Sequence, residues 1–189
     1  MAEVRLVVGL GNPGPEYAET RHNLGFKVIE ALEDALGIEV RQRKFSARIG
    51  EGLRAGVKVI LMKPWQFMNR SGGSVAAAAG FYKLDLRHLM VVLDDRALKP
   101  GVIRVRAQGS AGGHNGLADI IEKLGSDEFA RCRVGIGQCP GDEAVGYVLG
   151  RPQPQERPLL NEAILRTRDA VLYWLDYGIE KTMNEFNKS

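Results

Sequence analysis

Short apolar runs that end in glycine or in acids constrain the fold of this 189-residue chain more than any other feature. Val4 to Gly9 is a largely apolar run, and Met90 to Leu93 is a second one that leads directly into Asp94 and Asp95. A strand without polar alternation has to be buried on both faces, as central strands of a parallel sheet are. The sheet is therefore expected to carry helices on both sides.

Stripes of apolar residues at helical spacing separate these runs. The first stripe begins near His22 or Asn23 and ends before Gly37, where glycine suits the left-handed residue that follows a helix. Further stripes over Leu117 to Leu124 and Leu160 to Leu175 predict two more helices.

Three other segments predict further strands of the sheet and a helix that packs on it. Phe45 to Gly50 and Val57 to Met62, separated by a glycine-containing turn, predict a hairpin or adjacent strands. Ser71 is expected to cap an alanine-rich helix over Val75 to Tyr82. The alternation of strands and helices predicts an α/β fold: a single domain over residues 1–189, with a twisted mixed sheet and helices on both faces.

Composition excludes several classes of protein. Apolar residues make up 44% and charged residues 26% of the chain, ordinary values that argue against disorder or a fibre. The apolar runs fall far short of the roughly 20 residues of a membrane helix, and no signal-peptide pattern precedes the first strand, so we expect a cytoplasmic protein. A net charge of +3 does not by itself indicate nucleic-acid binding. Cys132 and Cys139 match neither a redox motif nor a zinc motif.

The loop Gly9 to Gly14 fits the pattern GxGxxG, which is typical of dinucleotide-binding turns. In that motif the third glycine opens a helix that binds pyrophosphate, whereas here Pro13, Pro15 and further residues precede the helical stripe. We therefore reject the interpretation of this loop as a dinucleotide-binding turn. A plain turn would account for the glycines but leaves Asn12 and His22 unexplained.

His22 lies at the expected start of a helix, where the positive end of the helix dipole favours a neutral imidazole that can accept a proton. Asp94 follows a core strand at the edge where open α/β sheets place their ligands. If Asp94 lay beside the other ring nitrogen of His22, it would fix the tautomer and stabilise the imidazolium. A lone histidine at a helix start is more often a surface or capping residue, so this role depends on the partner.

The motifs disfavour covalent and metal-based catalysis. Ser110 is out of register for a nucleophile elbow, and no cysteine has a neighbouring histidine, so covalent catalysis is not expected. The three histidines are scattered and form no metal-binding motif, so we expect neither a metal nor another cofactor. Water activated by a base is the remaining simple mechanism.

Two loops have the composition of ligand pockets. Lys63 to Asn69 combines large apolar groups with an amide, although Asn69 and Ser71 could instead compete as helix caps. In Gly112 to Gly116 the glycines permit close approach of a substrate, and Asn115 could also cap the next helix.

Arginines alternate along two predicted strands. Arg104 and Arg106 share one strand face, and Arg131 and Arg133 repeat the pattern on another strand. The two strands are therefore expected to present arginines to solvent.

In combination these segments resemble bacterial-type peptidyl-tRNA hydrolase, over nearly the whole chain. The motifs that carry the resemblance are Val8 to Gly14 with Tyr17, Thr20 to Asn23, Phe67 to Gly72, Asp94 after its strand, and Gly112 to Gly116.

The resemblance implies hydrolysis of the ester between the peptide and the tRNA 3′ end in peptidyl-tRNA, which recycles tRNA from stalled or dropped-off translation products. It implies that His22 activates water, that Asp94 holds His22 in its basic form, and that Asn12 helps to discriminate blocked from free amino groups. The implied substrate-binding residues are Tyr17, Phe67, Met68, Asn69 and Asn115, with Arg106 and Arg133 as a clamp for the tRNA 5′ phosphate. The expected state is a monomer.

The chain departs from the family pattern beside the catalytic aspartate. Leu93 stands where many members carry histidine or tyrosine, and Asp95 to Pro100 is less acidic than the usual segment. A shift by one residue would exchange Asp94 for Asp95, although successive strand residues point to opposite faces. The alternative functions are an RNA-binding protein without hydrolytic activity and an esterase or amidase for small substrates, which would need no arginine clamp.

Overall fold

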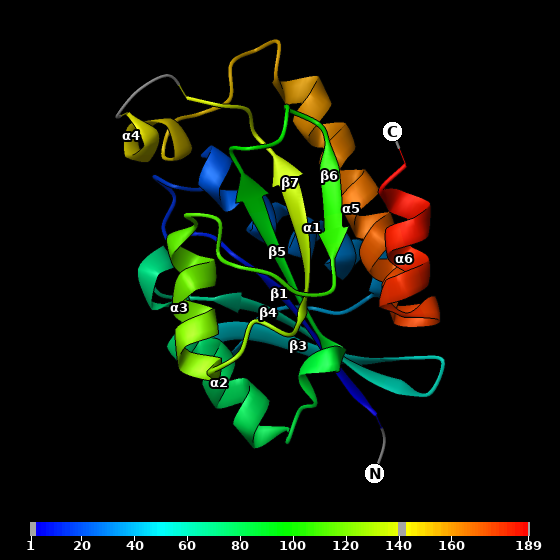
Figure 1. Cartoon of the computed structure of the whole chain (residues 1–189). Coiled ribbons are helices and arrows are strands. Elements are labelled where there is room, and N and C mark those ends of the chain that lie inside the picture. Colours follow the sequence, from blue (N-terminus) through cyan, green and yellow to red (C-terminus); the bar gives the residue numbers. More distant parts are fainter. Residues whose placement is uncertain (1–2, 140–142, 189) are drawn as a thin grey trace.

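The computed structural model describes residues 3–139 and 143–188 and contains a seven-stranded sheet in the order β2-β3-β4-β1-β5-β7-β6 (Figure 1). The four central strands β4, β1, β5 and β7 run parallel, and the outer strands pair antiparallel with their neighbours. The predicted mixed sheet is confirmed. The strands are β1 (Val4–Gly9), β2 (Gln42–Lys44), β3 (Ala47–Arg54), β4 (Val57–Pro64), β5 (Leu89–Asp95), β6 (Ile103–Arg106) and β7 (Ala130–Gly135).

Helices cover both faces of the sheet, as predicted (Figure 1). Helices α1, α5 and α6 pack on one face, and α2 and α3 pack on the other. In the part of the chain that the structure describes, no helix has the length and apolar character needed to cross a bilayer. The α-helices are α1 (Leu24–Leu36), α2 (Ser71–Phe81), α3 (Asn115–Leu124), α4 (Ala144–Val148), α5 (Arg157–Tyr177) and α6 (Ile179–Phe186), and the 3-10 turns are η1 (Arg21–Asn23), η2 (Met68–Arg70) and η3 (Leu86–His88).

Strand β1 is buried on both faces, as its sequence predicts. Val7 packs in the core under α1 and α5, whereas Leu6 and Val8 pack in the core under α2 and α3. Each such side chain contributes about 1.5–3 kcal/mol through removal from water. Strands β1 and β5 both contribute side chains to the cores on the two faces of the sheet. This packing holds the carboxyl ends of both strands in fixed positions.

A pair of glycines brings the start of α1 onto the end of β1. A Cβ atom at Gly9 would overlap the carbonyl of Gly25, and one at Gly25 would overlap the backbone of Leu10. The absence of side chains therefore permits direct backbone contact between helix and strand. This contact carries η1, with His22, over the carboxyl edge of the sheet.

Several local predictions were wrong in detail. The predicted strand from Phe45 begins at Ala47, because Phe45 and Ser46 have positive φ values of 58° and 52° and form the turn after β2. Ser71 does not cap its helix: it is the first residue of α2, and its hydroxyl donates to the carbonyl of Met68. Strand β2 and helices α4 and α6 are too short or too polar to give a clear sequence pattern.

Candidate active site

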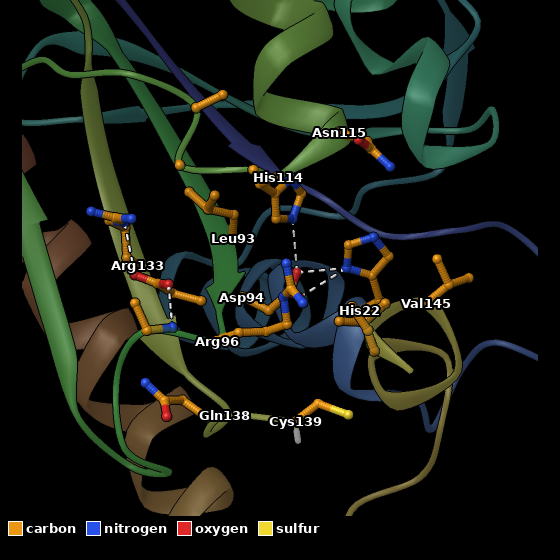
Figure 2. Close-up of a pocket in the computed structure, with 17 residues that line it drawn as sticks. His22, Leu93, Asp94, Arg96, His114, Asn115, Arg133, Gln138, Cys139 and Val145 are labelled. Atoms are coloured by element: carbon orange, nitrogen blue, oxygen red, sulfur yellow. Dashed lines mark hydrogen bonds and ion pairs between the residues drawn. The ribbon is translucent and has the colours of Figure 1, made fainter. Parts of the chain in front are cut away.

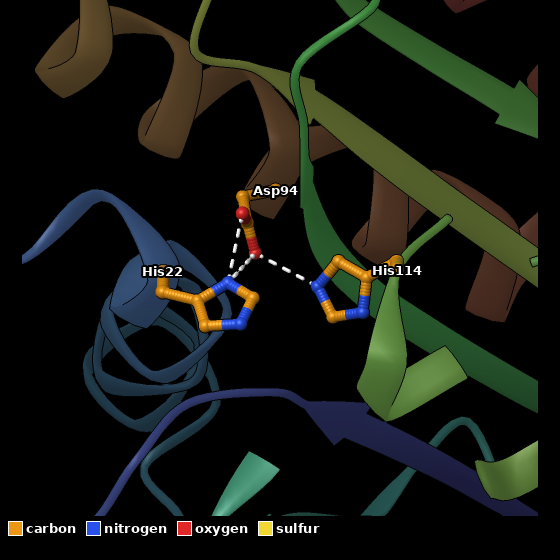
Figure 3. A group of neighbouring side chains, drawn as sticks. All are labelled: His22, Asp94 and His114. Atoms are coloured by element: carbon orange, nitrogen blue, oxygen red, sulfur yellow. Dashed lines mark hydrogen bonds and ion pairs between the residues drawn. The ribbon is translucent and has the colours of Figure 1, made fainter. Parts of the chain in front are cut away.

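His22 and Asp94 meet at the carboxyl edge of the sheet, as predicted (Figure 3). The Nδ1 atom of His22 lies 2.8 Å from Oδ1 and 2.9 Å from Oδ2 of Asp94. His22 comes from η1, and Asp94 comes from the end of β5. Because an ionised carboxylate only accepts hydrogen bonds, the proton of a neutral His22 resides on Nδ1 and Nε2 carries the lone pair.

His114 is a second imidazole on the same carboxylate, and the sequence did not identify it. Its Nε2 lies 2.9 Å from Oδ1 of Asp94, and its Nδ1 accepts a hydrogen bond from the backbone N–H of Leu117. These two contacts fix the tautomer with the proton on Nε2. His114, and not Asn115, is therefore the residue that caps α3. The view that the histidines are scattered was wrong for His22 and His114.

Asp94 is a buried anion held by two imidazoles. Its residue is 3% exposed. Burial alone would disfavour the charge, but the His114 and His22 imidazoles hold the pKa of this carboxyl well below its usual range. Asp94 therefore remains a carboxylate at neutral pH.

The same three side chains are the group in the described residues with a spacing suited to a metal ion. One ligand atom from each of His22, Asp94 and His114 lies within 4.8 Å of the others. Both imidazoles, however, lie at hydrogen-bond distance from the same carboxylate oxygen, Oδ1. The polar atoms that face one another in this group are therefore at hydrogen-bond distance from one another.

Asp95 lies on the opposite face of β5 and has other partners. Its Oδ1 accepts the backbone N–H of Ala97, and its Oδ2 lies 2.9 Å from Nε of Arg133. An exchange of roles between Asp94 and Asp95 is therefore inconsistent with the geometry, because Asp95 faces away from His22.

A pocket of about 340 Å³ borders this cluster (Figure 2). Its polar lining includes His22, His114, Asn115, Arg96 and Arg133. Its apolar lining comes from Leu93 and from three residues of α4 and its start, Ala144, Val145 and Val148. The pocket is therefore lined by imidazole, cationic and amide groups together with an apolar wall.

Asn12 ties the first loop to the loop after β4. Its side-chain Oδ1 accepts the backbone N–H of Met68 at 2.7 Å, and its backbone N–H donates to Oδ1 of Asn23 at 2.8 Å. Since the oxygen is used by Met68, the Nδ2 group of Asn12 holds the donors that remain for a ligand. The side chain of Met68 is buried against Gly116.

The remaining predicted binding residues lie around this junction. The ring of Phe67, 58% exposed, meets the ring of Tyr17 edge-on at a centroid distance of 6.2 Å. Asn69 is exposed in η2, and Asn115 is exposed at the first turn of α3. Aromatic and amide side chains thus lie around the junction of the two loops.

The two predicted arginine strands are neighbours, but one arginine is buried. Arg106 is exposed on β6, and Arg133 is partly exposed on β7. Arg131 is 1% exposed and donates to the carbonyls of Phe129, Gly109, Ser110 and Asp127, so the prediction that it faces solvent was wrong. Burial lowers the pKa of Arg131 to about 10.

Comparison with known proteins agrees with this geometry. A family model described as peptidyl-tRNA hydrolase matches residues 6–189. The peptidyl-tRNA hydrolase of Caldanaerobacter subterraneus subsp. tengcongensis is 48% identical over 182 residues, which cover 96% of this chain and 98% of that protein. That of Clostridium botulinum strain Hall is 45% identical, with 96% of each chain covered. The chain belongs to the peptidyl-tRNA hydrolase family.

Solved structures place the chain in the same family. The crystal structure of peptidyl-tRNA hydrolase from Acinetobacter baumannii matches with a TM-score of 0.93 at 39% identity and covers 99% of this chain and 96% of that one. A 5′-methylthioadenosine nucleosidase from Arabidopsis thaliana matches with a TM-score of 0.55 at 7% identity, which shows a shared fold alone. The chain is thus an enzyme, a hydrolase that acts on peptidyl-tRNA, and the resemblance drawn from its motifs is confirmed.

Arg21 joins the η1 turn, which carries His22, to the α4 wall of the pocket. Its guanidinium lies 2.8 Å from Oε2 of Glu156, donates to the carbonyl of Tyr147 and stacks over the Tyr147 ring at 4.0 Å. Its backbone N–H donates to the carbonyl of Gly150. The residue next to His22 therefore holds the segment that carries the apolar lining. Sequence patterns gave no signal for these long-range contacts.

Proposed function

We propose that this enzyme hydrolyses the ester between the peptide and the tRNA 3′ end with a water activated by His22 and without a covalent intermediate. The observation that carries the proposal is that Nδ1 of His22 faces both oxygens of Asp94, which leaves the lone pair on Nε2. Cys132 is unsuited to act as a nucleophile, because burial raises the pKa of its thiol to about 12.

In the proposed reaction, Nε2 of His22 takes a proton from water as the water oxygen attacks the ester carbonyl. Asp94 stabilises the resulting imidazolium and itself stays ionised. The tetrahedral intermediate then expels the ribose oxygen, which receives the proton from His22. The products are a free peptide carboxylate and a tRNA with a free terminal hydroxyl.

Amide groups around the pocket bind the peptide part of the substrate. The Nδ2 group of Asn12 donates to the peptide and helps to distinguish a blocked from a free amino group, since its Oδ1 is already engaged by Met68. Asn69 and Asn115 orient the carbonyl that becomes negatively charged, and Tyr17, Phe67 and Met68 form the apolar surroundings. One such donor contributes about 10²–10³ in kcat in other hydrolases.

The tRNA part of the substrate lies on the other side of the site. Arg106 and Arg133 occupy diagonal positions on one face of the antiparallel pair β6 and β7, and such neighbours are in general about 7–8 Å apart, with their Cβ atoms somewhat closer. This spacing suits two contacts to one phosphate group, such as the 5′ phosphate of tRNA. The enzyme acts as a monomer in the cytoplasm and recycles tRNA from stalled or dropped-off translation products.

The deciding experiment measures turnover of N-acetyl-aminoacyl-tRNA and of the unblocked aminoacyl-tRNA by wild type and by His22→Ala. We expect rapid cleavage of the blocked substrate only, and a loss in kcat of about 10²–10⁴ in the variant with binding retained. His88→Ala is the matched control, because His88 lies at the other end of β5 beside Glu3.

Wild-type activity in His22→Ala would refute the proposed base. Binding of tRNA without any cleavage would favour an RNA-binding protein, and equal cleavage of simple esters would favour a general esterase.

A further inference from the structure

We propose that the surface around Trp65 is a subsite for the peptide part of the substrate and favours acidic side chains close to the scissile ester. The inference rests on the proposed function, and it adds that the enzyme prefers some peptide sequences in its substrate over others. The subsite comprises Trp65 directly after β4, Phe26 on α1, Lys63 on β4 and Arg48 on β3, and we call it the Trp65 subsite.

The order of strands determines which part of the substrate reaches this subsite. Arg106 and Arg133 lie on β6 and β7, Asp94 lies on β5, and Asn12 follows β1. The next strands along the sheet are β4 and β3, which carry the Trp65 subsite. If tRNA lies over β6 and β7 and the ester lies at β5, the peptide continues from β1 toward β4 and β3.

Direct packing connects the Trp65 subsite with Asn12. A Cβ atom at Gly11 would lie 2.7 Å from the ring of Phe26, so the loop that carries Asn12 rests on this ring. Phe26 stacks on Trp65 at a centroid distance of 5.7 Å and an interplanar angle of 8°. The loop that starts at Trp65 is also bound to Asn12 through the backbone of Met68. A peptide that leaves Asn12 therefore meets Trp65 within a short distance.

The chemistry of the Trp65 subsite suits a carboxylate next to an apolar contact. Trp65 is 39% exposed, and the Arg48 guanidinium lies 5.2 Å and the Lys63 ammonium 5.8 Å from its ring. Within the described ranges, Glu30 is the acid nearest Lys63, at 3.9 Å, and no carboxylate lies within 4.0 Å of Arg48. Among the described residues, Arg48 thus offers a cation without a carboxylate partner beside a partly exposed aromatic ring.

Nucleic acid is the alternative occupant, because bases stack on tryptophan and phosphates bind arginine. The strand order favours the peptide, since the pair of arginines proposed to hold tRNA lies beyond β5 on the opposite side of the site. The two occupants differ in a measurable way: a subsite for upstream peptide residues has no effect on a substrate that carries a single amino acid.

The test compares N-acetyl-tripeptidyl-tRNAs that share one tRNA and a C-terminal alanine and carry Glu-Glu, Gln-Gln or Lys-Lys upstream. N-acetyl-alanyl-tRNA is the substrate control. We expect kcat/KM of the glutamate substrate to exceed that of the lysine substrate about two- to fivefold, the effect of one exposed ion pair, mainly through KM. Arg48→Gln removes most of this difference. Arg87→Gln, which removes a charge at the other end of the sheet, preserves it.

Trp65→Ala should lower kcat/KM for all three tripeptidyl substrates and leave N-acetyl-alanyl-tRNA unchanged. Equal rates for the glutamate and lysine substrates in the wild type would overturn this inference alone. A loss with N-acetyl-alanyl-tRNA in Trp65→Ala would assign the surface to RNA instead. Failure to cleave any of the substrates would overturn the proposed function, and the Trp65 subsite with it.

Discussion

Nε2 of His114 lies 2.9 Å from Oδ1 of Asp94, the same oxygen that lies 2.8 Å from Nδ1 of His22. One carboxylate thus accepts hydrogen bonds from two imidazoles whose tautomers are both fixed. The two histidines therefore share one oxygen of the carboxylate. We expect that His114 helps to orient Asp94 toward His22.

Replacement of His114 by asparagine tests this orienting role. Asparagine is a good helix cap, so His114→Asn retains the cap of α3 and removes the imidazole from Asp94. We expect a decrease in kcat of about tenfold, near the lower end of the 1.5–3 kcal/mol of a hydrogen bond to a charged group, because Asp94 loses one of the two imidazoles that orient it. KM should change little. An unchanged kcat would reduce His114 to a helix cap.

Asp94→Asn removes the charge while it keeps the shape of the side chain. An amide can donate to Nδ1 of His22 and so stabilise the tautomer that lacks a lone pair on Nε2. We expect kcat to fall by about 10²–10⁴, the contribution of a positioned base. Turnover within twofold of wild type would show that His22 does not depend on Asp94.

The pH dependence of folding provides a separate measurement on Asp94. Its folded-state pKa lies below the ordinary value, so its ionisation stabilises the folded state at pH values above the unfolded carboxyl pKa of about 3.9. This contribution is lost as the pH falls through the folded-state pKa. Denaturant titrations should therefore show a stability gap between wild type and Asp94→Asn that is present near pH 5 and shrinks toward pH 2.

The proposed tRNA clamp predicts a change in salt dependence. Each phosphate contact that is lost lowers the slope of log K against log salt by about one. Arg106→Gln should show the full effect because Arg106 is exposed, and Arg133→Gln a smaller one because Asp95 already engages its Nε. Fluorescence titrations of tRNA binding at several salt concentrations measure this slope. Arg168→Gln, on α5, is the control, and equal slopes in all three variants would exclude the clamp.

Features that depend on neighbouring residues could be predicted from the sequence. The stripe that ends at Gly37 gave α1, because Gly37 has the left-handed φ of 66° that ends a helix. The apolar run at the start of the chain gave β1, because burial on both faces leaves no polar positions. The positions of His22 at a helix start and of Asp94 at a strand end suggested the pair only conditionally, and the motif resemblance then implied the role of each residue.

Features that depend on strand order could not be predicted in this way. His114 meets Asp94 only because the loop before α3 returns to the carboxyl end of β5. Arg131 and Arg133 alternate identically in the sequence, yet loop carbonyls surround Arg131 and bury it. A periodic pattern shows which residues share a face, but not whether a loop covers that face.

Arg21 offers a test of how the pocket wall affects catalysis. Its guanidinium joins Glu156 and Tyr147, and Val145 and Val148 of the same segment line the pocket. Arg21→Lys keeps the charge but loses the planar group that stacks and donates at two points. We expect KM to rise about three- to tenfold with little change in the pH profile, because the wall shifts while His22 and Asp94 stay in contact. A double-mutant cycle with Glu156→Gln should give a coupling of about 0.5–3 kcal/mol in the free energy of unfolding. A decrease in kcat at constant KM would instead mean that Arg21 acts through the position of His22.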